Sequence, residues 1–318
     1  MLVFVIPHCP AVKLESHILF HKQSYRGELL ILLATMLAGI GWIASKLVIL
    51  EVPGETFVTA RFLLASIILL PFCYKQVFAL RPKQLLSLCA VGVVLAASIE
   101  VWVYAISISN TLSVGAFIMS LAMIIAPFIS WILFKVRPPS IFWLTLPITC
   151  IGIMLLTLTD GWVVERSQWF FLLSSVLLSL HFVLNKQVLN SVKPLTSICV
   201  QLFMIGAVGL IVMLIVSPES ASLNSHILFW FAVSTFVATC IRYLSQTLGQ
   251  FSVKIEKASL IMLLEPIWTL ILSVSFLGEV VETQKLIGGG IIILSLFIYI
   301  KFQNKPSLTK SVVVSQKS

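Results

Sequence analysis

The sequence predicts an all-α integral membrane protein with ten transmembrane helices, arranged as two inverted five-helix repeats. Three observations lead to this prediction: the composition, the length of the apolar runs, and an internal repeat. Of the 318 residues, 59% are hydrophobic and 10% are charged, and the mean hydropathy is +1.08. Soluble domains contain about 45–50% apolar and about 25% charged residues. The composition therefore excludes a soluble single-core enzyme, a disordered chain and a fibrous protein.

Ten apolar runs are long enough to cross a bilayer as helices. A crossing helix needs about 20 residues, because the hydrocarbon core is about 30 Å thick. The runs lack the alternation of barrel strands, so helices must satisfy the backbone hydrogen bonds. The predicted spans are residues 28–50, 56–78, 84–106, 109–134, 139–158, 168–190, 195–217, 226–249, 256–277 and 284–302.

The basic residues gather on one side of this topology. With a cytoplasmic N-terminus, 16 of the 21 lysines and arginines face inward, and only Arg166 and Lys285 face outward. This asymmetry follows the positive-inside rule and predicts a multi-pass protein of the inner (cytoplasmic) membrane with both termini cytoplasmic. The net charge of +9 then reports orientation, and no nucleic-acid partner is expected. The scattered cysteines form no C-x-x-C pair, so no metal site is expected.

Polar, aromatic and proline residues recur along the chain at an offset of 139 or 140 residues. The recurring pairs are Lys46 and Lys186, Tyr104 and Tyr243, and Pro127 and Pro266. The alternative to an internal repeat is that two stretches of the chain merely share a similar apolar composition. Copies of five spans each must enter the membrane from opposite sides, and secondary transporters bind substrate at the midplane between such inverted repeats. The predicted divisions are a cytoplasmic leader (1–27), two repeats (28–158 and 168–302) and a cytoplasmic tail (303–318).

Two motifs resemble the EamA family of the drug/metabolite transporter superfamily. In the ninth span, Leu264-Glu265-Pro266 is followed by Leu277-Gly278-Glu279, and the second span contains Thr59-Ala60-Arg61-Phe62. The resemblance covers roughly Arg26 to Phe302. The first repeat departs from the family pattern, because Ala126-Pro127 lacks the glutamate. The resemblance implies a central cavity lined by spans 1, 3, 4, 6, 8 and 9, and export of small metabolites.

Ionisable residues inside the predicted spans cost several kcal/mol, so each one is a candidate functional residue. Their depths, at 1.5 Å per residue, place Arg242, Glu265 and His181 in the inner half, and Lys46 with Glu100 in the outer half. Arg242 and Glu265 are expected to form an ion pair. A substrate or proton breaks this pair during transport, or the pair is static and fixes the packing of two spans. His181 either passes protons or makes an interhelical hydrogen bond.

The remaining candidates are aromatic, amide and proline residues. Trp42 and Tyr104 suit an aromatic cavity wall, and Gln246, one turn after Arg242, is expected to line the same cavity. Pro127 and Pro266 are candidate hinges, since proline removes a helix hydrogen bond.

Several basic and small residues have structural interpretations. Lys46 near the end of its span can instead extend to the interface, and Arg61 is expected to extend toward Glu51 or Glu55. The run Gly288–Gly290 permits close helix packing or a homodimer contact.

The pattern as a whole predicts a secondary transporter that moves a small metabolite or amino acid by alternating access. No nucleotide-binding motif is present, so no cofactor is expected and energy would come from gradients. Proton exchange, exchange with a counter-solute and facilitated efflux stay open. The alternatives in other classes are a membrane receptor that binds a ligand without moving it, and a membrane enzyme acting on lipid-linked substrates.

Overall fold

The computed structural model describes residues 13–109, 112–135, 137–157, 165–216, 224–278 and 283–302. Every regular element within these ranges is a helix. The elements are α1 (Lys13–Ile49), α2 (Gly54–Phe78), α3 (Pro82–Ser107), α4 (Leu112–Phe134), α5 (Ser140–Thr157), α6 (Arg166–Val188), α7 (Pro194–Val216), α8 (Ser225–Ala232), η1 (Val233–Ile241), α9 (Arg242–Ser252), α10 (Ile255–Met262), α11 (Glu265–Leu277) and α12 (Thr283–Phe302).

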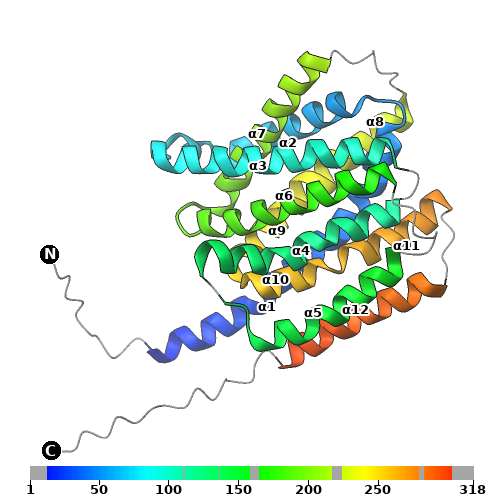
Figure 1. Cartoon of the computed structure of the whole chain (residues 1–318). Coiled ribbons are helices and arrows are strands. Elements are labelled where there is room, and N and C mark those ends of the chain that lie inside the picture. Colours follow the sequence, from blue (N-terminus) through cyan, green and yellow to red (C-terminus); the bar gives the residue numbers. More distant parts are fainter. Residues whose placement is uncertain are drawn as a thin grey trace, which may run out of the picture.

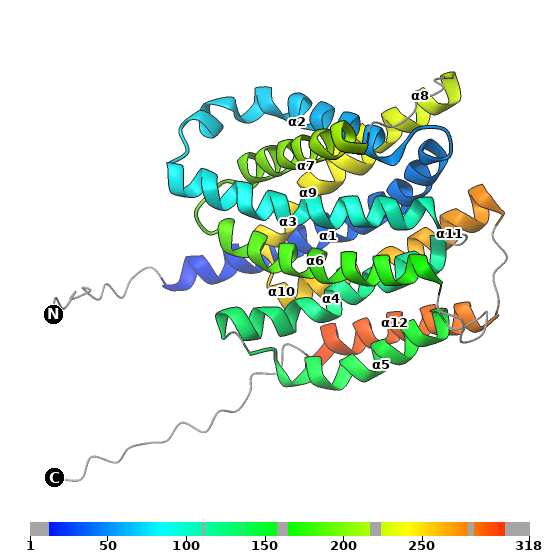
Figure 2. The ribbon, with the colours of Figure 1, turned by 45° about the horizontal axis from the view of Figure 1, so that its top comes forward.

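These helices form one bundle in which they run roughly along a common direction (Figures 1 and 2). Eight helical segments of the described ranges are long and apolar enough to cross a membrane, and they match the predicted spans 1–4 and 6–9. The apolar segments within α5 and α12 are shorter, at residues 140–152 and 286–299. The start of α1 and the end of α12 lie at the same end of the bundle (Figure 1).

The first helix begins earlier than the sequence predicts. α1 starts at Lys13, whereas the first span is predicted to start at residue 28. The predicted leader therefore overlaps this helix from Lys13 onward, while its residues 1–12 and the predicted tail from residue 303 lie outside the described residues.

The packing between helices repeats when the two halves of the chain are exchanged. α1 packs against α9 and α11, and α6, the first helix of the second half, packs against α3 and α4. Likewise, α2 packs against η1 and α7 packs against α3, while α2 and α7 pack against each other. α5 and α12 pair at one edge of the bundle (Figure 2). These contacts are those expected of two copies of one structural unit.

The corresponding lysines of the two halves make corresponding contacts. Lys46 donates hydrogen bonds to the carbonyl oxygens of Ile106 (3.2 Å) and Ser109 (3.0 Å), at the end of α3. Lys186 donates to the carbonyl oxygens of Gln250, Phe251 and Val253, at the end of α9. The last carbonyls of a helix lack backbone partners and attract cations. Each lysine thus caps the third span of its own half.

The eighth and ninth spans are irregular, in contrast to their counterparts in the first half. η1 is a π-helical segment between α8 and α9, and Leu263–Leu264 interrupt the ninth span between α10 and α11. In the first half, α3 is regular, and α4 runs without a break through Pro127. The Pro127 hinge predicted from the sequence therefore corresponds to a continuous helix, whereas Pro266 follows a break.

The α2–α7 contact depends on a small residue, and its enlargement gives a test of the packing. A Cβ on Gly206 would lie 2.6 Å from Leu63 Cγ and 2.8 Å from the Leu63 backbone nitrogen. We expect Gly206→Ala to lower the stability by about 1 kcal/mol, because helices in lipid associate through such close approaches. The measurement is the melting temperature of the purified protein in detergent.

Gly290→Ala is the matched control. Gly290 is exposed, and no heavy atom of the described structure lies within 4 Å of an added Cβ there. Equal melting temperatures for Gly206→Ala and the wild type would contradict the packing described for α2 and α7.

Candidate functional site

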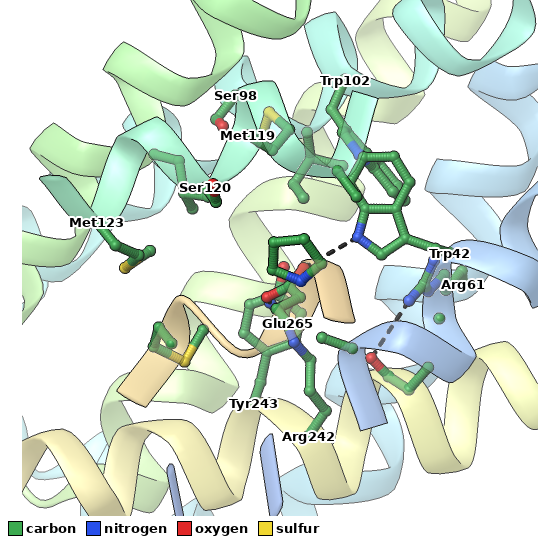
Figure 3. Close-up of a pocket in the computed structure, with 18 of the residues that line it drawn as sticks. Trp42, Arg61, Ser98, Trp102, Met119, Ser120, Met123, Arg242, Tyr243 and Glu265 are labelled. Atoms are coloured by element: carbon green, nitrogen blue, oxygen red, sulfur yellow. Dashed lines mark hydrogen bonds and ion pairs between the residues drawn. The ribbon is translucent and has the colours of Figure 1, made fainter. Parts of the chain in front are cut away.

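A pocket lies at the centre of the bundle, between the two halves of the chain. It contains about 690 Å³ free of protein atoms, part of it open to solvent. Spans 1, 3, 4, 6, 8 and 9 contribute to its lining, as the family resemblance implies, and α2 contributes as well. Figure 3 shows Glu265, Tyr243 and Arg242 on one side of the pocket, opposite Ser98, Met119, Ser120 and Met123.

Glu265 links three helices at the charged side of the pocket. Its Oε1 accepts a hydrogen bond from Trp42 Nε1 of α1 (2.9 Å), and its Oε2 lies 3.6 Å from Arg242 Nη2 of α9 (Figure 3). The ion pair predicted between Arg242 and Glu265 is therefore present. The Arg242 guanidinium also lies 4.5 Å from the centre of the Tyr243 ring, a cation–π distance. One carboxylate thus joins the first half of the chain to the second.

Backbone irregularities place both members of this ion pair. Glu265 is the first residue of α11, directly after the break at Leu263–Leu264, and Pro266 follows in the first turn. Proline is favoured there because its missing N–H has no helical acceptor in any case, and an acidic side chain is stabilised at a helix N-terminus. Arg242 is the first residue after η1. π-Helical segments occur frequently at functional sites.

Arg61 points into the bundle, which corrects the prediction that it extends toward Glu51 or Glu55. Its side chain is buried and lines the pocket. Its Nε donates to Thr239 Oγ1 (2.6 Å), its Nη1 to Ser45 Oγ (2.9 Å), and its Nη2 to the Ala238 carbonyl (3.3 Å).

The reason for this orientation lies in the π-helical segment. The Arg242 N–H bonds to the carbonyls of Val237 and Thr239, not to that of Ala238. The Ala238 carbonyl instead accepts from Arg61, so the buried guanidinium has good acceptors without leaving the membrane interior.

Aromatic and sulfur-containing side chains form the apolar part of the pocket. Trp42 packs edge-to-face on Trp102, with ring centres 5.1 Å apart, and it also contacts Phe171. Met119 and Met123 of α4 lie on the side opposite Arg242 (Figure 3). The hydroxyl groups on this side are occupied within the protein: Ser120 Oγ donates to the Phe117 carbonyl of its own helix, and Ser98 Oγ donates to the Ser174 carbonyl of α6. The pocket is therefore amphipathic, with one charged and one apolar side.

Four of the residues predicted from the sequence come together in this pocket, namely Trp42, Arg242, Glu265 and Pro266. The other six candidates are not among the lining residues. Lys46 caps α3, as described above. Tyr104 is 40% exposed and stacks edge-to-face on Phe170, outside the pocket.

Glu100 faces the α2–α7 side of α3, and the predicted grouping with Lys46 is not formed. A Cβ on Gly209 of α7 would lie 3.1 Å from Glu100 Oε1, which is buried and has no hydrogen-bond partner within the described ranges. Depth along a helix alone does not determine which neighbour a side chain faces, and this is why the grouping is wrong.

His181 belongs to a buried polar network outside the pocket lining. Its Nε2 is 2.8 Å from Gln201 Oε1, and Gln201 Nε2 donates to Asn185 Oδ1 (2.8 Å) and Ser197 Oγ (2.8 Å). Asn185 donates in turn to Gln250 Oε1 (2.7 Å), so the network connects α6, α7 and α9.

Gln246, which the sequence places on the cavity wall, is buried and is not one of the pocket-lining residues. Its Oε1 has no hydrogen-bond partner in the part of the chain that the structure describes. It lies on α9, one turn beyond Arg242.

Among the lining residues that the sequence did not assign to the site are Arg61, Tyr243 and Trp102. The signals for the first two were available. Arg61 stands in the Arg-Phe motif that resembles the family, and Tyr243 is one member of a recurring pair. Trp102 has no such signal, because tryptophans facing lipid and tryptophans facing a cavity look alike in sequence.

The arrangement defines a multi-pass membrane protein built from two repeats around a shared pocket. The chain matches the model of the EamA-like transporter family over residues 25–158 and again over residues 166–301, so it belongs to that family. No curated protein matches it. Among the 28 matching chains of solved structures, one titled "Crystal structure of protein" aligns with a TM-score of 0.68 over 87% of this chain and 96% of that chain, at 11% identity. This likeness shows the fold.

Proposed function

We propose that the protein is a secondary transporter that exports a small metabolite by alternating access, with the central pocket as its substrate site. The observation that carries this proposal is the position of Glu265. Its carboxylate bonds to Trp42 of the first repeat and to Arg242 of the second. A substrate that binds one of these partners competes with Glu265, and thereby changes how the two repeats are held together. Differential contacts of this kind are what a ligand needs in order to shift a conformational equilibrium.

The experiment that tests the function is untargeted metabolite profiling. Cells that overexpress the protein and cells with the empty vector are compared, in both medium and cytoplasm. We expect at least one small metabolite to accumulate in the medium and to fall in the cells. An unchanged profile across growth conditions would contradict export.

The proposed topology has ten spans in two inverted repeats, in the inner membrane, with both termini cytoplasmic. It is supported by the exchange symmetry of the helix contacts and by the 16-to-2 distribution of basic residues. α5 and α12, although their apolar segments are short, would cross the bilayer together as the pair that they form at the edge of the bundle.

Reporter fusions test this topology directly. We expect fusions after Pro82, after Pro138 and at the C-terminus to give cytoplasmic signals, and a fusion after Pro53 to give an external signal, because basic residues surround the first three positions. The measurement is a pair of reporters that are active on opposite sides of the membrane. An external signal at Pro82 or Pro138 would refute the span assignment.

Two partners of the proposed transporter follow from the same arrangement. A proton or a counter-solute would bind after substrate release and allow the site to return to its starting orientation. Glu265 is the acidic side chain among the described residues that line the pocket. A homodimer would use the exposed side of α12, where Gly289 has no described neighbour within 4 Å of an added Cβ.

A further inference from the structure

The charges buried in the pocket do not balance. Among the described residues that line it, Arg61 and Arg242 are positive and Glu265 is negative, which leaves a net charge of +1. Arg61 is 4% exposed, and its hydrogen bonds go to two hydroxyls and one carbonyl, all of them neutral. Glu100 does not compensate, because it faces α7 and is not a lining residue. An uncompensated charge inside the hydrocarbon region costs several kcal/mol.

Arg242 has a donor that the described residues leave unused. Its Nε is buried and has no hydrogen-bond partner among them. Its Nη2 lies 3.6 Å from Glu265, well beyond the 2.7–2.9 Å of a strong charge-assisted hydrogen bond. The guanidinium is therefore only loosely engaged, and it offers planar donors of the kind that match a carboxylate.

The opposite side of the pocket suits an apolar body. Trp102, Met119 and Met123 present aromatic and thioether surface there. A ligand that fills the whole pocket thus needs one polar end and one apolar end.

We propose that the substrate is an amphipathic organic monoanion, an inference that rests on the proposed function. Its carboxylate lies at Arg242, close to the positive charge of Arg61, and its apolar body lies against α3 and α4. A monoanion brings the net charge of the pocket to zero. A zwitterion leaves the excess of +1, and a cation raises it to +2.

Three probes with the same ring and different charges test this proposal on the purified full-length protein in nanodiscs. Indole-3-acetate is an anion, tryptophan a zwitterion and tryptamine a cation at neutral pH. Their dissociation constants are measured by isothermal titration calorimetry at fixed ionic strength. We expect indole-3-acetate to bind at least tenfold more tightly than tryptophan, and tryptamine to bind most weakly. This comparison uses the wild type, so it does not depend on the folding of any variant.

Charge-removing variants locate the source of the preference. Arg61→Gln and Arg242→Gln should each weaken indole-3-acetate binding by at least tenfold and leave tryptamine binding nearly unchanged or stronger. Arg61→Lys keeps the charge and should keep the order of the three probes. Lys75→Gln removes an equal charge from an exposed position on the same helix as Arg61, and it should change none of the three constants.

The outcomes separate this proposal from the proposed function. Equal binding of the three probes, a reversed order, absence of binding by all three, or an anion preference that survives both Gln variants would overturn the monoanion proposal. Export seen in metabolite profiling together with any of these results would leave the transporter function standing. Preferred binding of the anion without any export would support the ligand class and refute the transport function.

Discussion

Glu265→Gln and Arg242→Ala are each expected to reduce transport by at least tenfold while the protein still inserts into the membrane. Glu265→Gln keeps the shape of the side chain and an oxygen that can accept from Trp42, but it removes the charge that faces Arg242. Arg242→Ala leaves the Glu265 carboxylate without its cation. Either change leaves an unpaired charge in the membrane interior, which costs several kcal/mol and exceeds the roughly 1.4 kcal/mol of a tenfold effect. The measurement is the efflux rate of the exported metabolite per unit of membrane-inserted protein.

A second ion pair supplies the control. Lys257 of α10 pairs with Glu28 of α1. The two side chains are 18% and 19% exposed, which is close to the exposure of the Arg242 and Glu265 side chains. Glu28→Gln and Lys257→Ala therefore make the same chemical changes at another contact of α1. Normal transport by both Glu265→Gln and Arg242→Ala would reduce the pocket pair to a packing contact.

Gln201→Leu is expected to lower the stability by about 3 kcal/mol without changing transport per folded molecule. The substitution removes the partner of His181 Nε2, Asn185 Oδ1 and Ser197 Oγ at a fully buried position. Each buried polar group left without a hydrogen bond costs about 1–3 kcal/mol. The measurement combines the melting temperature in detergent with the efflux rate at several pH values.

The control for this variant is Gln187→Leu. Gln187 is half-buried and accepts one long hydrogen bond, from Asn190 (3.4 Å), so its loss should have little effect on the melting temperature. An unchanged melting temperature for Gln201→Leu would refute the structural importance of the network. A loss of the pH dependence of efflux at unchanged stability would assign His181 the proton-passing role instead.

Much of the fold follows from the sequence because the bilayer imposes a length on each apolar run. The predicted spans 56–78 and 195–217 lie within two residues of α2 and α7 at both ends. The irregular segments could not be predicted in this way. Arg61 of α2 bonds to the Ala238 carbonyl and to Thr239 Oγ1 of η1, and contacts with another helix leave no trace in the local sequence pattern.

The site is predictable to the extent that charge in the membrane interior is costly. This rule identified Arg242 and Glu265, and depth along the helix correctly placed them together. It failed for Arg61, since a guanidinium five residues from a span end can either reach the interface or turn inward. That choice depends on whether acceptors are present on the neighbouring helices, and here Thr239 supplies one.

The hydrogen-bond register of the π-helical segment before Arg242 also determines how the following helix is rotated about its axis. An α-helix turns by about 100° per residue, so a shift of one residue in the hydrogen-bond register of η1 rotates everything after it by that angle about the axis. Such a shift would carry Arg242 from the pocket to a different face of the span, with no bending of the helix. Arg61 bonds to Ala238 and Thr239 in the present register. Such a shift would therefore also change the contacts of Arg61 with the half-span that presents Arg242.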